Sequence, residues 1–275
     1  MIDLHTHSSK SDGTFTPEEL VKKAADISLN AIALTDHDTL DGLDEAKKCA
    51  DKNNIQFIPG IELEIEYHPG EFHLLGLGIF DWKDSSLERT LATLRAYRNK
   101  RNTEMVQLIQ NDGIDFTEEE LKNTAGGRII ARPHFAKLLV EKKVAKNMRH
   151  AFDKFLGVDQ KYYVPKKVMQ LEDGIRLIRE AGGKPVIAHP LSLYLSWGKM
   201  PERIAAWKEM GVVGIEAWHS GATANQGKRF ERLADDLGMY ATGGSDFHGE
   251  NRKDRKLGQG GGKKPIPDHF MDFLL

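Results

Sequence analysis

The first thirteen residues, Met1 to Gly13, read MIDLHTHSSKSDG. An apolar start followed by His5-Thr6-His7 is typical of a strand that ends with two histidines on one side, because side chains alternate along an extended backbone. Two neutral imidazoles directed at one point suit a metal ion better than an apolar core. The stretch therefore predicts a first strand that ends at a metal site, with the carboxylate of Asp12 close by.

Short apolar segments alternate with helical ones through much of the chain. The first helix is expected to begin at TPEE, with Thr16 as its N-cap and Pro17 in its first turn. Predicted strands lie at AIALTD, at IQFIPGIELEIEY with its hairpin partner FHLLGLGIF, and at KPVIAHP, VVGIEAWHS and MYATGGSDFH. Strands separated by helices predict parallel βα units, in either an open sheet or a barrel.

The segment 85–165 interrupts this alternation, because its stretches have helical spacing and no clear strand. We predict an all-helical insertion or cap domain at 85–165, within a catalytic α/β domain formed by 1–84 and 166–275. Residues 85–167 hold 17 Lys+Arg and 10 Asp+Glu, a net charge of +7, which leaves −9 for the remainder. This contrast favours cations bound by the body and an anionic partner drawn to the insertion. Chance variation of the surface explains it equally well.

The bulk properties are those of a soluble enzyme, with 275 residues, 40% of them hydrophobic and 29% charged. Apolar runs are too short to span a membrane, and the N-terminus lacks the apolar segment of a secretion signal. The single cysteine, Cys49, predicts a buried thiol and excludes a disulfide within the chain. We therefore expect a cytoplasmic protein with no membrane partner, and nothing indicates an obligate protein partner.

Six of the eleven histidines fall at or near the ends of predicted strands, where α/β barrels place their active sites. Together with three carboxylates they form a set of nitrogen and oxygen ligands without a thiolate: His5, His7, Asp12, His37, Glu62, His73, His189, Asp246 and His248. Such ligands suit Zn²⁺, Mn²⁺ or Fe²⁺. Nine ligands exceed one coordination sphere, so we predict a multinuclear site. Taken singly, each could instead be a surface, turn or core residue.

At these residues the chain resembles the polymerase and histidinol phosphatase (PHP) superfamily of metal-dependent phosphoesterases. The matching motifs are DLHTHSSKSDG, LTDHDT, GIELE, AHP and GSDFH, together with His73, spread over about residues 1–80 and 165–275. The resemblance implies a distorted (β/α)₇ TIM-like barrel that holds three divalent ions, with Glu62, His189 and Asp246 catalytic. The implied ligand sets are His5, His7, Glu62 and Asp246; Glu62, His73 and His189; and Asp12, His37 and His248.

The insertion contains GGRIIARPHFAKLLV. This segment resembles the subgroup that acts on nucleoside 3′,5′-bisphosphates and on short 5′-phosphorylated RNA, which includes ribonuclease AM. The resemblance implies phosphate binding by Arg132 and His134, although Arg132-Pro133 could simply begin a helix. His219, at the end of its strand, is a further candidate for contact with the substrate. Asp36 and Asp38 flank His37 and could either orient it or form a turn.

The resemblance implies hydrolysis of nucleotide phosphate esters, at the 3′-phosphate of nucleoside 3′,5′-bisphosphates or in short 5′-phosphorylated RNA. A divalent ion lowers the pKa of bound water to about 7, so the expected nucleophile is metal-activated hydroxide. The sequence leaves three alternatives: a phosphatase for a small metabolite such as histidinol phosphate, a hydrolase of C–N bonds, and a non-catalytic, metal-stabilised binding module. A C–N hydrolase would not need the basic insertion, and the complete ligand set speaks against the binding module.

Overall fold

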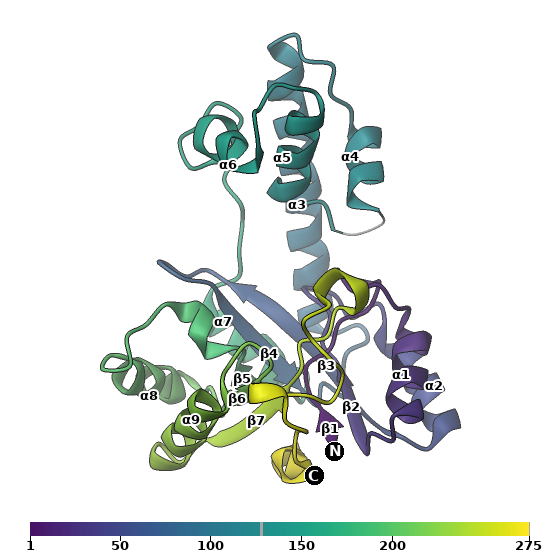
Figure 1. The fold of residues 1–275 in the computed structure, drawn as a ribbon, viewed down its shortest axis with the longest axis vertical. Helices are drawn as coiled ribbons and strands as arrows, with labels where there is room; N and C mark the ends of the chain where they lie inside the picture. Colours follow the sequence, from purple (N-terminus) through teal and green to yellow (C-terminus); the bar gives the residue numbers. More distant parts are fainter. Residues whose placement is uncertain (127–128, 275) are drawn as a thin grey trace. The chain divides into compact units, whose positions relative to one another are not determined.

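The structure is a computed structural model that describes residues 1–126 and 129–274. The chain divides into two compact units, Met1–Arg89 with Val168–Leu275, and Thr90–Lys167. Figure 1 shows that the strands belong to the first unit, whereas the second is built from helices. Gly127 and Arg128, from the segment GGRIIARPHFAKLLV, lie outside the described residues.

The first unit is built on a sheet of seven strands that are neighbours in chain order. They are β1 (Ile2–Asp3), β2 (Ala31–Leu34), β3 (Gln56–Ile65), β4 (Phe72–Leu77), β5 (Lys184–Ile187), β6 (Gly214–His219) and β7 (Tyr240–Gly244). The hairpin partner β4 is antiparallel to both β3 and β5, and all the other neighbours are parallel. The single reversed strand distorts the regular βα pattern.

The two ends of this sheet meet beyond its first and last strands. The Leu4 N–H donates to the Gly243 carbonyl at 3.2 Å, and Thr6 forms a parallel bridge with Phe247. The sheet is therefore a nearly closed barrel. This confirms the predicted distorted (β/α)₇ barrel and decides against an open sheet.

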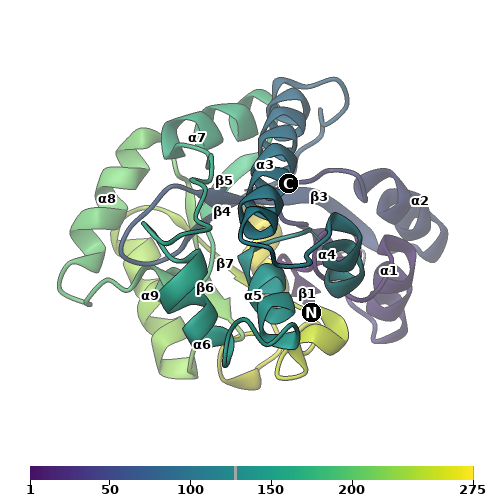
Figure 2. The ribbon, with the colours of Figure 1, turned by 90° about the horizontal axis from the view of Figure 1, so that it is seen from above.

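Helices lie outside the strands, as Figure 2 shows for α1 (Pro17–Asp26), α2 (Leu43–Asn53), α7 (Leu171–Glu180), α8 (Met200–Met210) and α9 (Ala224–Asp236). The start of α1 confirms the prediction from TPEE. Thr16 Oγ1 accepts the Glu19 N–H at 3.2 Å, and the Glu19 carboxylate accepts the Thr16 N–H at 2.8 Å. This reciprocal pair satisfies two backbone donors at the helix start. Cys49, in α2, is a buried free thiol, as predicted.

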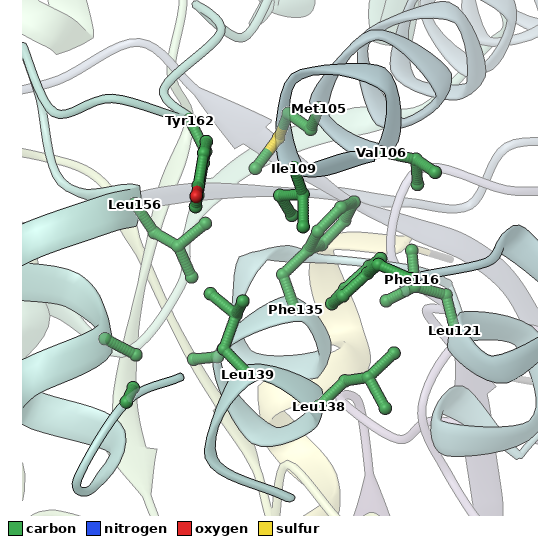
Figure 3. Packing of buried hydrophobic residues seen from close by; sticks show 13 residues of the cluster. Met105, Val106, Ile109, Phe116, Leu121, Phe135, Leu138, Leu139, Leu156 and Tyr162 are labelled. Atoms are coloured by element: carbon green, nitrogen blue, oxygen red, sulfur yellow. The ribbon is translucent and has the colours of Figure 1, made fainter. Parts of the chain in front are cut away.

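Every regular element in the described residues of Thr90–Lys167 is helical. α3 (Ser86–Asn111) begins in the first unit and is followed by α4 (Glu118–Ala125), α5 (Arg132–Glu141), α6 (Met148–Ala151) and a π-helical turn at Phe152–Leu156. Figure 3 shows the apolar cluster between these helices, in which the Phe116 and Phe135 rings stack with centroids 5.8 Å apart. The second unit therefore has a hydrophobic core of its own.

None of the helices within residues 1–126 and 129–274 combines the length and the apolar character that a membrane span requires.

Candidate metal centre

The barrel brings the nine predicted ligands together at one rim. His5 and His7 follow β1, His37 follows β2, and Asp246 and His248 follow β7. Glu62 lies within β3, and His189 follows β5. Because β4 runs in the opposite direction, its second residue, His73, reaches the same rim from the beginning of a strand. The reversed strand thus explains why this ligand does not sit at a carboxyl end.

Glu62 lies at the centre of the cluster and is completely buried. Its Oε1 is 2.8 Å from His73 Nδ1 and 2.8 Å from His189 Nε2. Its Oε2 lies 3.1 to 3.2 Å from ring nitrogens of three further histidines, His5, His7 and His37. One carboxylate thus faces five imidazoles, and this environment is compatible with a bridging ligand.

Two aspartates extend the cluster on its other side. Asp246 Oδ1 lies 3.2 Å from His7 Nε2 and 3.3 Å from His248 Nδ1. Asp12 Oδ1 lies 3.2 Å from His248 Nε2, and its Oδ2 is 4.0 Å from His37 Nε2. Candidate ligands from the loop after β1 therefore lie directly against candidate ligands from the loop after β7.

Three groups of these side chains have ligand atoms that all lie within 4.8 Å of one another. They are His5, His7, Glu62 and Asp246; His37, Glu62 and His73; and His7, Asp12, His37 and His248. The first group has the same members as one predicted ligand set. The second contains His37 where the prediction has His189, and the third adds His7 to the predicted three. His189 still reaches Glu62 directly, as described above.

The donor atoms at the centre have the character of metal ligands. The Nε2 atoms of His5 and His7 are only 3.1 Å apart, and a hydrogen bond between them would require one ring to donate and the other to accept. Although three ring nitrogens lie within 3.2 Å of Glu62 Oε2, none of them forms a hydrogen bond with it, and the buried His7 Nδ1 is likewise without a hydrogen-bond partner among the described residues. Buried polar atoms are rarely left without partners, so this arrangement fits bound divalent cations well.

The electrostatics of the cluster favour cations. Burial disfavours charge on His7, yet Asp246 and Glu62 raise its pKa to about 10. Burial alone would raise the pKa of Glu62, but His37, His5 and His73 hold it well below its usual range. Carboxylates that stay ionised in a buried site and hold a proton on a neighbouring imidazole would hold a metal ion in the same way.

Glu216, within β6, is a buried residue of the site that sequence reasoning missed. Its Oε1 lies 2.9 Å from His5 Nδ1, and its Oε2 accepts the His189 N–H at 2.7 Å. Because its carboxylate holds Nδ1, His5 presents Nε2 to the cluster. The available signal was an acid inside the apolar strand GIEAWHS.

Asp3 and Asp36 organise the loops that carry the candidate ligands. Asp3 accepts hydrogen bonds from Ser245 Oγ and from the Gly258 N–H at 2.7 Å, and burial raises its pKa to about 6. Asp36 accepts from Ser8 Oγ and Ser11 Oγ, both at 2.6 Å. Asp36 thus fixes the loop after β1, a role different from the orientation of His37 considered above.

His219 faces Asp246 at the edge of the cluster. Its Nδ1 accepts the Gly221 N–H at 3.0 Å, so its proton lies on Nε2, which is 3.1 Å from Asp246 Oδ2. A cleft of about 300 Å³ opens beside it and is lined by most of the candidate ligands, together with His219, Arg252 and Arg255. The two arginines are further residues that the sequence reasoning did not select.

Arg132 and His134 lie at the start of α5 in the second unit. Arg132 Nη1 approaches the Leu156 carbonyl at 3.4 Å, and its guanidinium lies 5.7 Å from the centre of the Tyr163 ring. His134 Nδ1 accepts the Ala131 N–H at 3.0 Å and so caps the helix. Both residues therefore make local contacts in the helical unit, where Arg132 remains partly exposed.

Comparison with known proteins identifies relatives that share this architecture. The model of the PHP domain family matches residues 3–156. A 3′,5′-nucleoside bisphosphate phosphatase from Chromobacterium violaceum is 34% identical over 96% of this chain and 93% of its own length. A 5′-3′ exoribonuclease from Haemophilus influenzae is 33% identical over 90% of this chain and 89% of its own.

Two solved structures share the fold with a TM-score of 0.77. One, from Bifidobacterium adolescentis, carries the description of a metal-dependent phosphoesterase; it is 29% identical and covers 100% of this chain and 95% of its own. The other, from Chromobacterium violaceum, is described as an amidohydrolase with bound sulfate; it is 32% identical and covers 97% of this chain and 92% of its own. The curated relatives take their names from phosphoester chemistry. Together the comparisons confirm the predicted class, a metal-dependent phosphoester hydrolase.

Proposed function

This chain belongs to the PHP domain family, and we propose that it hydrolyses nucleotide phosphate esters, at the 3′-phosphate of nucleoside 3′,5′-bisphosphates or in short 5′-phosphorylated RNA. The observation that carries the proposal is the ring of histidines and carboxylates around buried Glu62, beside a cleft that also contains two arginines. Ligands for cations and donors for phosphate oxygens occur there together.

We propose that the cluster holds three divalent ions, Mn²⁺, Zn²⁺ or Fe²⁺. Glu62 would bridge two of them, because its two oxygens face different histidines. The remaining ligands would be His5, His7, Asp12, His37, His73, His189, Asp246 and His248. When bound, the ions supply a hydroxide nucleophile at neutral pH and neutralise charge on the phosphoryl oxygens.

The chain's own residues would fix the geometry of this site. Glu216 holds the His5 ring at Nδ1 and accepts the backbone N–H of His189, so the His5 imidazole keeps its direction and the main chain at His189 is fixed. His219 Nε2 holds Asp246 Oδ2, which leaves Oδ1 facing the histidines. Preorganised ligands and donors do not have to rearrange as charge develops on the phosphoryl group, which is the main electrostatic contribution of such sites.

The proposed substrate carries a second phosphate that is not cleaved. The names of the two curated relatives support a nucleotide or RNA substrate. Arg132 and His134 are the proposed holders of the remote phosphate, and the positive charge of residues 85–167 supports an anionic ligand there. Binding energy from a remote group can position the reacting one, so its removal should lower kcat as well as raise KM. A cytoplasmic location suits such a substrate and forms part of the proposal.

The test is phosphate release from adenosine 3′,5′-bisphosphate compared with 3′-AMP, both with Mn²⁺. The proposal expects the bisphosphate to be clearly the better substrate. Equal rates on 3′-AMP, or faster release from histidinol phosphate, would contradict the nucleotide assignment and leave the phosphoesterase class in place. Loss of release on chelation, and its return with added Mn²⁺, would show that the reaction depends on the metal.

A further inference from the structure

A basic loop follows the last strand of the barrel and supplies two arginines to the catalytic cleft. The loop reads GENRKDRKL, from Gly249 to Leu257, and contains four Lys+Arg and two Asp+Glu. Arg252 and Arg255 line the cleft together with the candidate metal ligands. The two arginines differ in burial, because the Arg252 side chain is 48% exposed and the Arg255 side chain only 10%.

Arg255 is anchored through one of its three nitrogens. Nη1 donates to the Asp246 backbone carbonyl at 3.0 Å and also forms an ion pair with the Asp246 side chain at Oδ2. Asp246 has a backbone φ of +53°, an unusual value for a residue with a side chain. Arg255 therefore holds both the main chain and the side chain of this residue, and the position of its own guanidinium is fixed in return.

The rest of the guanidinium is not used in the same way. Among the described residues, the buried Arg255 Nε has no hydrogen-bond partner, and the hydrogen bonds and ion pairs of this side chain all run through Nη1. A buried charged donor without an acceptor is costly, so such a group usually has a partner in the functional state. The Nε and Nη2 donors form one edge of the planar guanidinium, and such an edge matches two oxygens of a phosphate.

We propose that Arg255 is a substrate-binding residue that receives a phosphoryl group in the catalytic cleft on its Nε/Nη2 edge. This inference rests on the proposed function and adds a phosphate-binding residue within the barrel unit itself. The cleft then recognises the reacting phosphate without help from the helical unit. Asp246 acts as the anchor that prevents the guanidinium from moving when the anion leaves.

The test measures binding of inorganic phosphate, which is the product, to the metal-loaded full chain by titration calorimetry. Arg255→Lys keeps the charge but replaces the planar fork with a single point of donation. We expect its Kd for phosphate to rise about tenfold, and that of Arg255→Gln, which also removes the charge, to rise about a hundredfold. Lys253→Ala is the matched control, because this neighbouring side chain is 79% exposed and pairs with Glu250; its Kd should not change.

Metal content and the melting temperature are measured on the same samples. An unchanged phosphate Kd in both Arg255 variants would overturn the inference. Loss of metal, with a normal Kd once the metal is restored, would also overturn it, since Arg255 would then only position Asp246. Hydrolysis of p-nitrophenyl phosphate by the wild type tests the proposed function separately. A wild type without phosphatase activity would reject that function, whereas a phosphate Kd that depends on Arg255 would still support the phosphate site.

Discussion

His5 Nδ1 lies 2.9 Å from Glu216 Oε1, although 211 residues separate the two in the chain. Both side chains are completely buried. Burial disfavours charge on His5, yet the carboxylates of Glu216, Glu62 and Asp246 together hold its pKa well above the usual range. Glu216 is therefore placed to fix the direction in which the first histidine of the chain presents Nε2.

Replacement of Glu216 by Gln should weaken metal binding by about ten- to a hundredfold, the usual effect of losing a partner of a metal ligand. The amide keeps one acceptor oxygen but places an NH₂ donor where the second oxygen meets either His5 Nδ1 or the His189 N–H. Metal titration of the chelator-treated variant measures the loss. Glu209→Gln, at an exposed position on α8, serves as the control. Wild-type affinity in Glu216→Gln would refute this role.

Gly244, the last residue of β7, allows the last strand to approach the first. A Cβ added there would lie 2.2 Å from His5 Cβ and 2.6 Å from Glu216 Oε1. Gly244→Ala should therefore displace His5, reduce metal content and lower the free energy of unfolding by about 1–3 kcal/mol. Gly198→Ala is the matched control, because its Cβ would meet no heavy atom within 4 Å. Thermal or urea unfolding with elemental analysis compares them, and equal behaviour of the two variants would contradict the packing argument.

Glu62 should matter more than any ligand at the edge of the cluster, because its two oxygens face five histidines. The metal-replete protein is expected to hold more than one divalent ion per chain. Glu62→Gln should lower both this number and turnover further than Asp12→Asn, which changes a partly exposed residue of the proposed ligand set. Elemental analysis after desalting gives the count. At most one tightly bound ion in the wild type, or near-normal turnover in Glu62→Gln, would refute the bridged, multinuclear site.

The sequence predicted the parts of this site that are encoded locally. Alternation at His5-Thr6-His7 and the position of histidines after apolar segments were sufficient to anticipate the rim, since parallel strands bring their ends together. The start of α1 at Thr16 was predictable because its signals are also local: the residues of a capping box lie within four positions of one another.

The supporting residues were not predictable, because their contacts depend on the closure of the barrel. Glu216 meets His5 across the sheet, and Asp36, which follows β2, meets Ser8, which lies 28 residues earlier in the chain. Arg255 reaches Asp246 through a loop without regular strand structure. An acidic residue inside a short apolar strand indicates a buried carboxylate, but the sequence does not indicate which residues it contacts.

The last prediction concerns the residue that binds the phosphate that is not cleaved, which we place in the helical unit. If Arg132 holds the phosphate that is not cleaved, Arg132→Ala should lower kcat/KM for adenosine 3′,5′-bisphosphate by about ten- to a hundredfold, the value of one charge-assisted bidentate contact. Hydrolysis of p-nitrophenyl phosphate, which has no second phosphate, should hardly change. The change in kcat/KM for each substrate is measured on the same metal-loaded preparations.

Lys137→Ala is the matched control for Arg132→Ala, because it removes a positive charge from an exposed position on the same helix, where Lys137 pairs with Glu141. If the loss of a positive charge alone explained the effect of Arg132→Ala, the two variants would show the same change in kcat/KM. Arg132 also contacts the Leu156 carbonyl and the Tyr163 ring, so a structural role is the competing explanation. That role predicts a lower melting temperature and equal losses on both substrates. A selective loss on the bisphosphate, with the melting temperature of the wild type, can arise only if Arg132 acts on the substrate.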